Sequence, residues 1–287
     1  MWQKIQDHIQ QVTQTSFSIQ DRRSVGGGSI NQAYQVSDGS QLYFVKLNQA
    51  SKVAMFEAEA LGLREMAQAQ AIRVPQALCW GTADGQSYIV LEWLELGSGP
   101  KANWAQMGQQ LAAMHHHVSK QGFGWHQSNT IGDTPQQNPW TTDWGIFFAE
   151  HRIGYQFRLA QRRGAHFLQE AAVLEAIPEI LTAHSPQPSL VHGDLWSGNA
   201  AFSQGEPVIL DPAVYYGDRE VDVAMTELFG GFPRAFYQGY HEAWPLDDTY
   251  QQRKILYNLY HILNHFNLFG GSYGSQAERM MDQILKF

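Results

Sequence analysis

The sequence is poor in cysteine: its 287 residues contain only Cys79, so no disulfide can form within it. Since disulfides are typical of oxidising compartments, we expect a cytoplasmic protein. The N-terminal segment MWQKIQDHIQQVTQ is polar and lacks the apolar region of a secretory signal. No run approaches the ~18 consecutive apolar residues that indicate a membrane-spanning helix, so we expect no association with a membrane.

Positive charge is also scarce. Lys and Arg together number 19 against 27 Asp and Glu, which gives a formal net charge of −8. A protein that binds nucleic-acid phosphates usually has the opposite balance, so we expect no nucleic-acid partner. Hydrophobic residues make up 44% and aromatic residues 13% of the chain, which excludes a disordered protein and favours a large packed core. The length suits roughly two domains of ~150 residues each or one bilobal unit.

The first third of the chain combines strand-like and helical segments. Residues 1–16 and 51–69 have the three- and four-residue apolar spacing of helices. Runs rich in β-branched and aromatic residues, separated by turn signals, predict strands between and after these helices. The clearest is YFVKL, which contains Lys46. The pattern therefore predicts a sheet with associated helices.

The remainder of the chain is predicted to be mostly helical, with two exceptions. Residues 119–141 are polar and contain prolines, glycines and asparagines, which predicts a long loop of the kind that often carries function. Two short strand-like runs, 200–203 and 207–210, predict a small β insert. We expect an N-terminal part at residues 1–94 and a C-terminal part at residues 95–287.

A short polar stretch, LVHGDLWSGN, is the first candidate for chemistry. It places Asp194 and Asn199 five residues apart. A carboxylate can accept the proton of an attacking hydroxyl, and an amide oxygen can bind Mg²⁺, so this is the D-x-x-x-x-N arrangement of kinases. Taken alone, the stretch also fits a strand-ending turn capped by an Asp.

A second carboxylate, Asp211, ends the apolar run VILDP. A carboxylate at the end of an apolar strand needs a partner, and Mg²⁺ is a suitable one. Together with Asp194 and Asn199, and with a short hairpin between them, Asp211 indicates a phosphoryl-transfer site more specifically than any one of the three. A structural Asp-Pro turn remains the alternative.

The N-terminal part offers a phosphate-binding site in the expected order. The stretch GGGSIN supplies a loop whose backbone N–H groups can approach phosphates. Lys46 follows on the next strand, and the helix at 51–69 offers Glu57 and Glu59. The loop matches only half of the pattern GxGxxG, because Asn31 stands where the third glycine would be. A kinase is favoured because the loop, Lys46 and the helix precede Asp194 and Asp211 in the chain, in the order that a kinase requires.

Three stretches, LVHGDLWSGN, LDPAVYYGDREVDVAM and HILNHFNLFGGSYGSQA, resemble the fructosamine kinase (ketoamine kinase) family over nearly the whole chain. This family belongs to the protein-kinase-like superfamily, with the aminoglycoside and choline kinases. The resemblance implies an α+β bilobal fold with an antiparallel N-lobe sheet plus helix and a helical C-lobe. It also implies ATP and Mg²⁺ as cofactors.

The implied acceptor is a ketoamine such as fructosamine, ribulosamine or erythrulosamine, on a small amine or on a protein lysine. Phosphorylation at O3 of the sugar would lead to deglycation. Two alternatives stay open: a kinase for another alcohol of the aminoglycoside or choline type, and a pseudokinase that only binds. The resemblance fixes neither the preferred sugar nor the oligomeric state, with a monomer slightly favoured.

The resemblance assigns roles to the residues already named. Asp194 matches the catalytic base, and Asn199 and Asp211 match the metal ligands. Lys46 matches the lysine on the ATP phosphates, paired with Glu59, because EALGL fits the pattern E-A-x-x-L of this helix. The implied phosphate loop consists of Gly26, Gly27, Gly28 and Ser29.

The remaining roles implied by the resemblance are supporting ones. The hinge that binds adenine matches Glu92, Trp93 and Leu94. His192 would support the catalytic loop, and Trp196 would flank the sugar. Asp222 would brace the catalytic loop rather than touch the substrate. The consecutive histidines His115, His116 and His117 diverge by ~100° each on a helix, so a structural role is expected for them.

Overall fold

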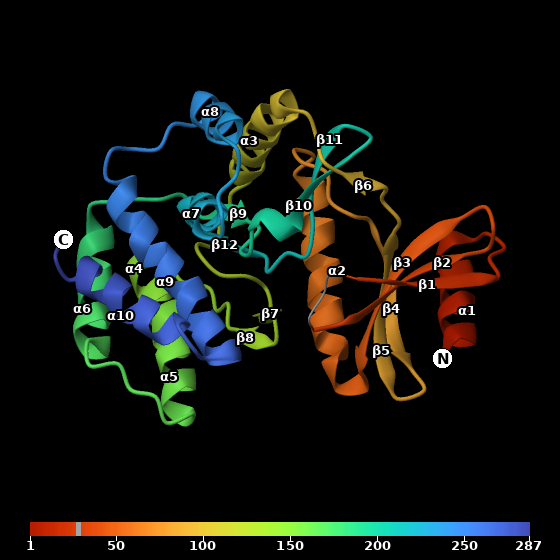
Figure 1. Ribbon diagram of the computed structural model, residues 1–287, viewed down its shortest axis with the longest axis horizontal. Helices are drawn as coiled ribbons and strands as arrows, with labels where there is room; N and C mark the ends of the chain where they lie inside the picture. The colour runs from red at the N-terminus through yellow and green to blue at the C-terminus, as the bar shows by residue number, and fades with distance from the viewer. Residues whose placement is uncertain (27–29) are drawn as a thin grey trace.

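The computed structural model describes residues 1–26 and 30–287 (Figure 1). Its N-terminal region is built on a five-stranded antiparallel sheet, as the sequence predicted. In spatial order the strands are β1 (Asp21–Val25), β2 (Gln32–Ser37), β3 (Leu42–Gln49), β5 (Gln86–Glu92) and β4 (Ala77–Ala83). Helices α1 (Trp2–Thr13) and α2 (Val53–Gln68) pack against opposite faces, with α2 between the sheet and the C-terminal region (Figure 1).

The alternation of side chains along β3 places Lys46 on the face directed toward α2. Val45 and Leu47 are buried in the small core beneath α1, together with Ile5 and Ile9. Since successive side chains of a strand point to opposite faces, the residue between Val45 and Leu47 points away from α1. The apolar pattern of this strand thus aims its only lysine into the interior between the sheet and α2.

The C-terminal region is helical, as expected. Its helical elements are α3 (Lys101–His115), α4 (Trp144–Phe147), the π-helical turn Phe148–Ile153, α5 (Gly154–Arg162), α6 (Glu170–Thr182), α7 (Glu220–Leu228), α8 (Arg234–Ala243), α9 (Tyr250–Phe269) and α10 (Tyr273–Ile284). Helix α9 is the central one, because many of its side chains are buried, among them Leu256, Tyr257 and Leu263. Its neighbours pack around it in one large core that extends to α2.

The predicted β insert is confirmed, and it organises the loops around it. Strand β10 (Ala200–Ser203) pairs with β11 (Glu206–Ile209) on one side and with β6 (Leu96–Gly97) on the other. A separate pair, β9 (Ser189–Val191) and β12 (Tyr215–Gly217), runs antiparallel. Because β9 precedes the Asp194 loop and β12 follows Asp211, this pairing brings the two loops side by side.

The segment 119–141 is not the irregular loop that the sequence predicted. It contains a hairpin of two short strands, β7 (Asn129–Ile131) and β8 (Thr134–Gln136). Strands of three residues are too short to show an alternating apolar pattern, and Pro135 inside the second one is a signal against a strand. The hairpin lies beside α2, at the junction of the two regions (Figure 1).

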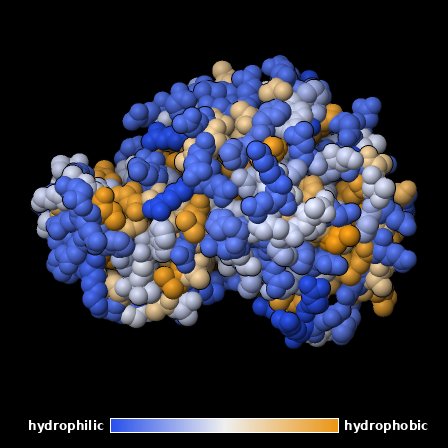
Figure 2. Space-filling model, turned by 180° about the vertical axis from the view of Figure 1, so that it is seen from behind, coloured by the Kyte–Doolittle hydropathy of each residue, from blue (hydrophilic) through white to orange (hydrophobic). Residues whose placement is uncertain are grey.

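The face shown in Figure 2 is mostly hydrophilic, with small, separate hydrophobic patches. Among the described residues, no helix is both long and apolar enough to cross a membrane. Between residues 92 and 96 the chain leaves the five-stranded sheet and enters the sheet of β6, β10 and β11. A division of the chain after residue 94 stays a prediction.

Candidate active site

Two adjoining cavities lie between the N-terminal sheet and the C-terminal region. The larger has a volume of about 410 Å³ and is lined by the segment 91–96. The smaller has a volume of about 210 Å³ and is lined by Glu59 and Asp194. Both are lined by Asn31, Lys46 and Asp211. Lys46, predicted to bind the ATP phosphates, and Asp194, predicted to act on the acceptor, therefore lie in one continuous region.

Lys46 lies at the centre of a cluster of charged side chains, which we call the charged end of the two cavities. Its Nζ atom lies 2.7 Å from Glu59 Oε1 and 2.7 Å from Asp211 Oδ1. Burial disfavours the ammonium, but the carboxylates of Asp211 and Glu59 outweigh it and raise the lysine pKa above its ordinary value. Lys46 is thus held as a cation. The structure brings Glu59 to it, whereas Glu57 is exposed.

Asp194 lies in the loop after β9 and lines the smaller cavity. Its backbone carbonyl accepts a hydrogen bond of 2.8 Å from Asn199 Nδ2, which also lies 3.5 Å from its carboxylate. Burial raises the pKa of Asp194 well above its usual range, and the negative charges of Asp211 and Asp222 add to this. A cation or a proton close to these carboxylates is therefore strongly favoured.

Asn199 and Asp211 present oxygen donors to the smaller cavity. The Asn199 amide nitrogen is used by Asp194, and in the described part of the chain no hydrogen bond reaches its Oδ1 atom. Leu210 N–H donates to the Asn199 carbonyl over 2.9 Å, which holds the two segments together. An amide oxygen beside a carboxylate is a donor set that Mg²⁺ accepts.

His192 holds the loop that carries Asp194. Its Nε2 atom lies 2.8 Å from the Leu210 carbonyl, and its Nδ1 atom accepts from the Asp194 N–H over 3.2 Å. Burial lowers the pKa of His192, so the ring is neutral, with the proton on Nε2. The imidazole thus ties the loop of Asp194 to the segment that ends at Asp211.

Asp222, at the start of α7, lies beneath the same loop and is fully buried. Its carboxylate accepts the N–H groups of His192 and Gly193 over 2.7 and 2.8 Å. The Nε2 atom of His115, the first of the three consecutive histidines, lies 3.0 Å away. Burial opposes the charge of Asp222, but these hydrogen bonds lower its pKa below the ordinary value. The carboxylate touches the loop backbone and does not line the cavities.

Gly193 explains why this loop departs from the His-Arg-Asp sequence of protein kinases. Its φ angle is 80°, and a Cβ atom added to it would lie 2.2 Å from the Ala213 carbonyl oxygen. That oxygen belongs to the neighbouring loop, whose Ala213 N–H donates to the His192 carbonyl over 2.8 Å. Only glycine combines this φ with so close an approach.

The predicted hinge and the aromatic residue of the loop also line the cavities. Glu92, Trp93 and Leu94 line the larger one, as does Gly26. Trp196 lines the smaller one and is 40% exposed. The other residues of the predicted phosphate loop, Gly27, Gly28 and Ser29, lie outside the described residues.

Sequence reasoning missed the residues of the hairpin. Asn129, Thr130 and Gly132 line the smaller cavity together with Asp194. The only signal was the polar composition of 119–141, which indicated function for the segment but for no particular residue.

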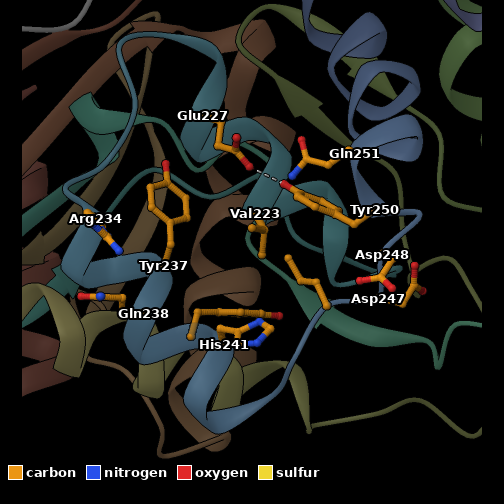
Figure 3. A pocket seen from close by; sticks show the side chains of 12 residues that line it. Val223, Glu227, Arg234, Tyr237, Gln238, His241, Asp247, Asp248, Tyr250 and Gln251 are labelled. Atoms are coloured by element: carbon orange, nitrogen blue, oxygen red, sulfur yellow. Dashed lines mark hydrogen bonds between the residues drawn. The ribbon is translucent and has the colours of Figure 1, made fainter.

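A larger cavity, of about 550 Å³, lies elsewhere, between α7, α8 and α9 (Figure 3). It holds none of the predicted site residues. Beside it, oxygen and nitrogen atoms of His184, Glu220 and Asp247 lie within 4.8 Å of one another. Arg253 bridges the two carboxylates at 2.7 and 2.8 Å, so both already have a cationic partner. Among the described residues, His261 and His265 on α9 belong to no such cluster.

Comparison with known proteins agrees with this geometry. A family model described as fructosamine kinase matches residues 1–287. A probable ketoamine kinase of Synechocystis sp. is 60% identical over 99% of this chain and 97% of its own. A chloroplastic protein-ribulosamine 3-kinase of Arabidopsis thaliana is 44% identical over 92% of this chain and 82% of its own. The crystal structure of a candidate fructosamine-3-kinase from Haemophilus somnus 129PT has a TM-score of 0.94 at 32% identity, covering 99% of this chain and 98% of that one. The resemblance and the kinase-like α+β fold expected from the sequence are confirmed.

Proposed function

Since the chain belongs to the fructosamine kinase family and is a phosphotransferase with a hydroxyl acceptor, we propose that it transfers the γ-phosphoryl group of ATP to O3 of a ketoamine sugar. The observation that carries the proposal is the convergence of Lys46, Asp194 and Asp211 on one region. A pseudokinase would have no need of all three.

ATP would bind in the larger cavity, with its phosphates at the charged end formed by Lys46, Glu59 and Asp211. The hinge residues Glu92, Trp93 and Leu94 would hold adenine, and Lys46, fixed by Glu59, would bind the phosphates. The loop from Gly26 to Ser29 would cover these phosphates with its backbone N–H groups. Asn199 and Asp211 would bind Mg²⁺, which supplies positive charge against the phosphates when it is bound.

The acceptor would lie in the smaller cavity, with its O3 hydroxyl at Asp194. Asp194 accepts the hydroxyl proton while the O3–phosphorus bond forms and the bond from phosphorus to the leaving oxygen of ADP breaks. His192 and Asp222 keep the loop of Asp194 in place through their hydrogen bonds to its backbone and to Leu210. The exposed ring of Trp196 offers an apolar face to the C–H edges of the sugar.

The position of the new phosphate determines the fate of the product. An O3 phosphate lies on the carbon next to the C2 carbonyl of a ketoamine. When C1 loses a proton, the resulting C1=C2 enaminol expels the allylic phosphate from C3. Water then hydrolyses the C1=N bond that is left, which releases the amine and leaves the sugar as a 3-deoxy-dicarbonyl, so deglycation needs no second enzyme. A free amine or a protein lysine fits this chemistry equally, and a cytoplasmic location and a monomeric state remain predictions.

A panel of acceptors tests the proposal. ADP formation is measured with fructosamine, ribulosamine and erythrulosamine, and with an aminoglycoside and choline as competing alcohols. We expect turnover with ketoamines, a ³¹P resonance for a phosphate at O3, and slow release of inorganic phosphate afterwards. Turnover confined to the aminoglycoside or to choline would contradict the proposal.

A further inference from the structure

Residues of the hairpin β7–β8 line the smaller cavity and not the larger one, to which the proposed function assigns the adenine. The residues shared by the two cavities are Asn31, Lys46 and Asp211, which belong to the charged phosphate end. Asp194 lines only the smaller cavity, and so do Asn129 and Thr130. An acceptor whose hydroxyl lies at Asp194 therefore comes next to these two side chains.

The side chain of Asn129 is held by three hydrogen bonds and has one N–H group without a partner among the described residues. Its Oδ1 atom accepts from Gln136 Nε2 over 2.8 Å and from Asn138 Nδ2 over 2.9 Å. Its Nδ2 atom donates to the Val214 carbonyl over 2.7 Å. An amide nitrogen carries two hydrogens, so one N–H remains beyond these bonds. A sugar hydroxyl or carbonyl oxygen is a suitable acceptor for it.

Thr130 supplies a second polar group. It is half-buried and lines the cavity. Its hydroxyl makes no hydrogen bond within the described part of the chain, so it can both donate to and accept from a ligand. Its partner across the hairpin is Pro135, which has no N–H to compete for it.

The hairpin is anchored from behind by an unusual residue, Arg152 in the π-helical turn. Arg152 is fully buried, and its hydrogen bonds among the described residues all go to carbonyl or amide oxygens and none to a carboxylate. Instead, its Nη1 donates to the Gln137 carbonyl over 2.8 Å and its Nη2 to Asn138 Oδ1 over 2.7 Å. Its guanidinium lies over the ring of Tyr215, 4.0 Å from the centroid.

Burying this charge carries a desolvation cost, which its hydrogen bonds and the rings of Phe147, Tyr215 and Tyr260 around the guanidinium offset. What Arg152 does is hold Asn138, which holds Asn129 in turn. Helix α9 supports the same hairpin, because Tyr260 donates to Gln136 Oε1 over 2.8 Å. Side chains of the π-helical turn and of α9 therefore hold this side of the cavity as a wall.

We propose that Asn129 and Thr130 recognise the hydroxyl and carbonyl oxygens of the acceptor sugar, and that Arg152 is the positioning residue that acts through Asn138 to hold them. This inference rests on the proposed ketoamine kinase activity and names the acceptor side of its site. Neutral donors on this wall match a polyol sugar, which is distinguished by where its oxygens lie.

The substitution Thr130→Val tests the contact directly, because it removes the hydroxyl, keeps the shape and breaks no hydrogen bond of the fold. We expect kcat/KM for the ketoamine to fall about three- to tenfold, the size of one hydrogen bond, through a higher KM for the ketoamine. The KM for ATP should not change. Thr82→Val, on the exposed face of β4, is the matched control and should leave both KM values unchanged.

The substitution Arg152→Lys tests the positioning role. Lysine keeps the charge but cannot reach two acceptors with a planar fork. We expect the KM for the ketoamine to rise by about tenfold or more, with kcat and the KM for ATP nearly unchanged. The control Arg158→Lys alters an exposed arginine of the neighbouring helix α5 and should have no effect.

The outcomes separate the two proposals. A wild-type enzyme that turns over ketoamines, combined with an unchanged ketoamine KM in Thr130→Val, would overturn the recognition role of the hairpin and leave the proposed function standing. A rise in the KM for ATP as large as that for the ketoamine in Arg152→Lys would reduce Arg152 to a structural residue. No turnover of any ketoamine by the wild type would overturn the proposed function and the acceptor assignment with it.

Discussion

The nucleotide end and the acceptor end of the proposed active site are built by different means. At the nucleotide end, charged side chains meet directly: Lys46 lies 2.7 Å from both Glu59 and Asp211. At the acceptor end, the neutral amide of Asn129 is held through Asn138 by the remote Arg152. Phosphates require charge and little shape, whereas a sugar requires placed hydrogen-bond partners. A short motif can encode the first kind of site, but the second depends on tertiary structure.

Asp194 stands where the two ends meet, and Asp194→Asn should have the largest effect. Asparagine keeps the shape but cannot accept the hydroxyl proton, so we expect kcat to fall by about 10²- to 10⁴-fold. The KM for ATP and that for the ketoamine should stay close to the wild-type values. Steady-state kinetics, with nucleotide binding measured by calorimetry, checks this. A variant with more than a tenth of wild-type kcat would rule out Asp194 as the base.

Lys46→Met should affect the nucleotide end alone. It removes the cation that pairs with Glu59 and Asp211, so we expect weaker ATP binding and a kcat lower by about 10²-fold, as for the loss of one strong electrostatic contact. The KM for the ketoamine should change little. Lys101→Met, at the exposed start of α3, is the control. A comparable rise in both KM values would show that the two ends are not separate.

The contrast between the two ends also explains how well the sequence predicted each of them. The charged residues of the nucleotide end lie in short motifs, so Lys46, Asp194 and Asp211 could be placed before the fold was known, and the fold itself followed from the same motifs. Thr130 could not, because a hairpin of two three-residue strands has no periodicity to detect. Arg152 could not either, since its role depends on contacts with residues 14 and 15 positions earlier in the chain.

Gly193→Ala tests the contact that joins the two loops. The added Cβ would meet the Ala213 carbonyl oxygen at 2.2 Å, and the φ of 80° is unfavourable for alanine. We expect a loss of about 1–3 kcal/mol in the free energy of unfolding, from the strained backbone alone, and a larger fall in kcat than in nucleotide affinity. Denaturant unfolding and kinetics on the same sample would show both. Gly205→Ala, in the β10–β11 turn at a similar φ of 85° but without backbone contact, isolates the effect of the clash.

The smallest expected effect lies away from both ends and separates folding from chemistry. His184 Nε2 is 2.7 Å from Asp218 Oδ2, with Glu220, Asp247 and Arg253 close by. Burial disfavours its charge, but the hydrogen bond to Asp218 and the nearby carboxylates outweigh it and raise the His184 pKa above 6.5. A raised pKa means that the folded protein binds the proton more tightly than the unfolded chain does. The stabilisation is therefore complete below pH ~6.5 and is lost as the pH rises through the raised value.

His184→Gln should lower the urea midpoint more at pH 6 than at pH 8.5. The pH profile of kcat, which depends on Asp194, should keep its shape. An equal loss at both pH values would show that the contact does not depend on charge.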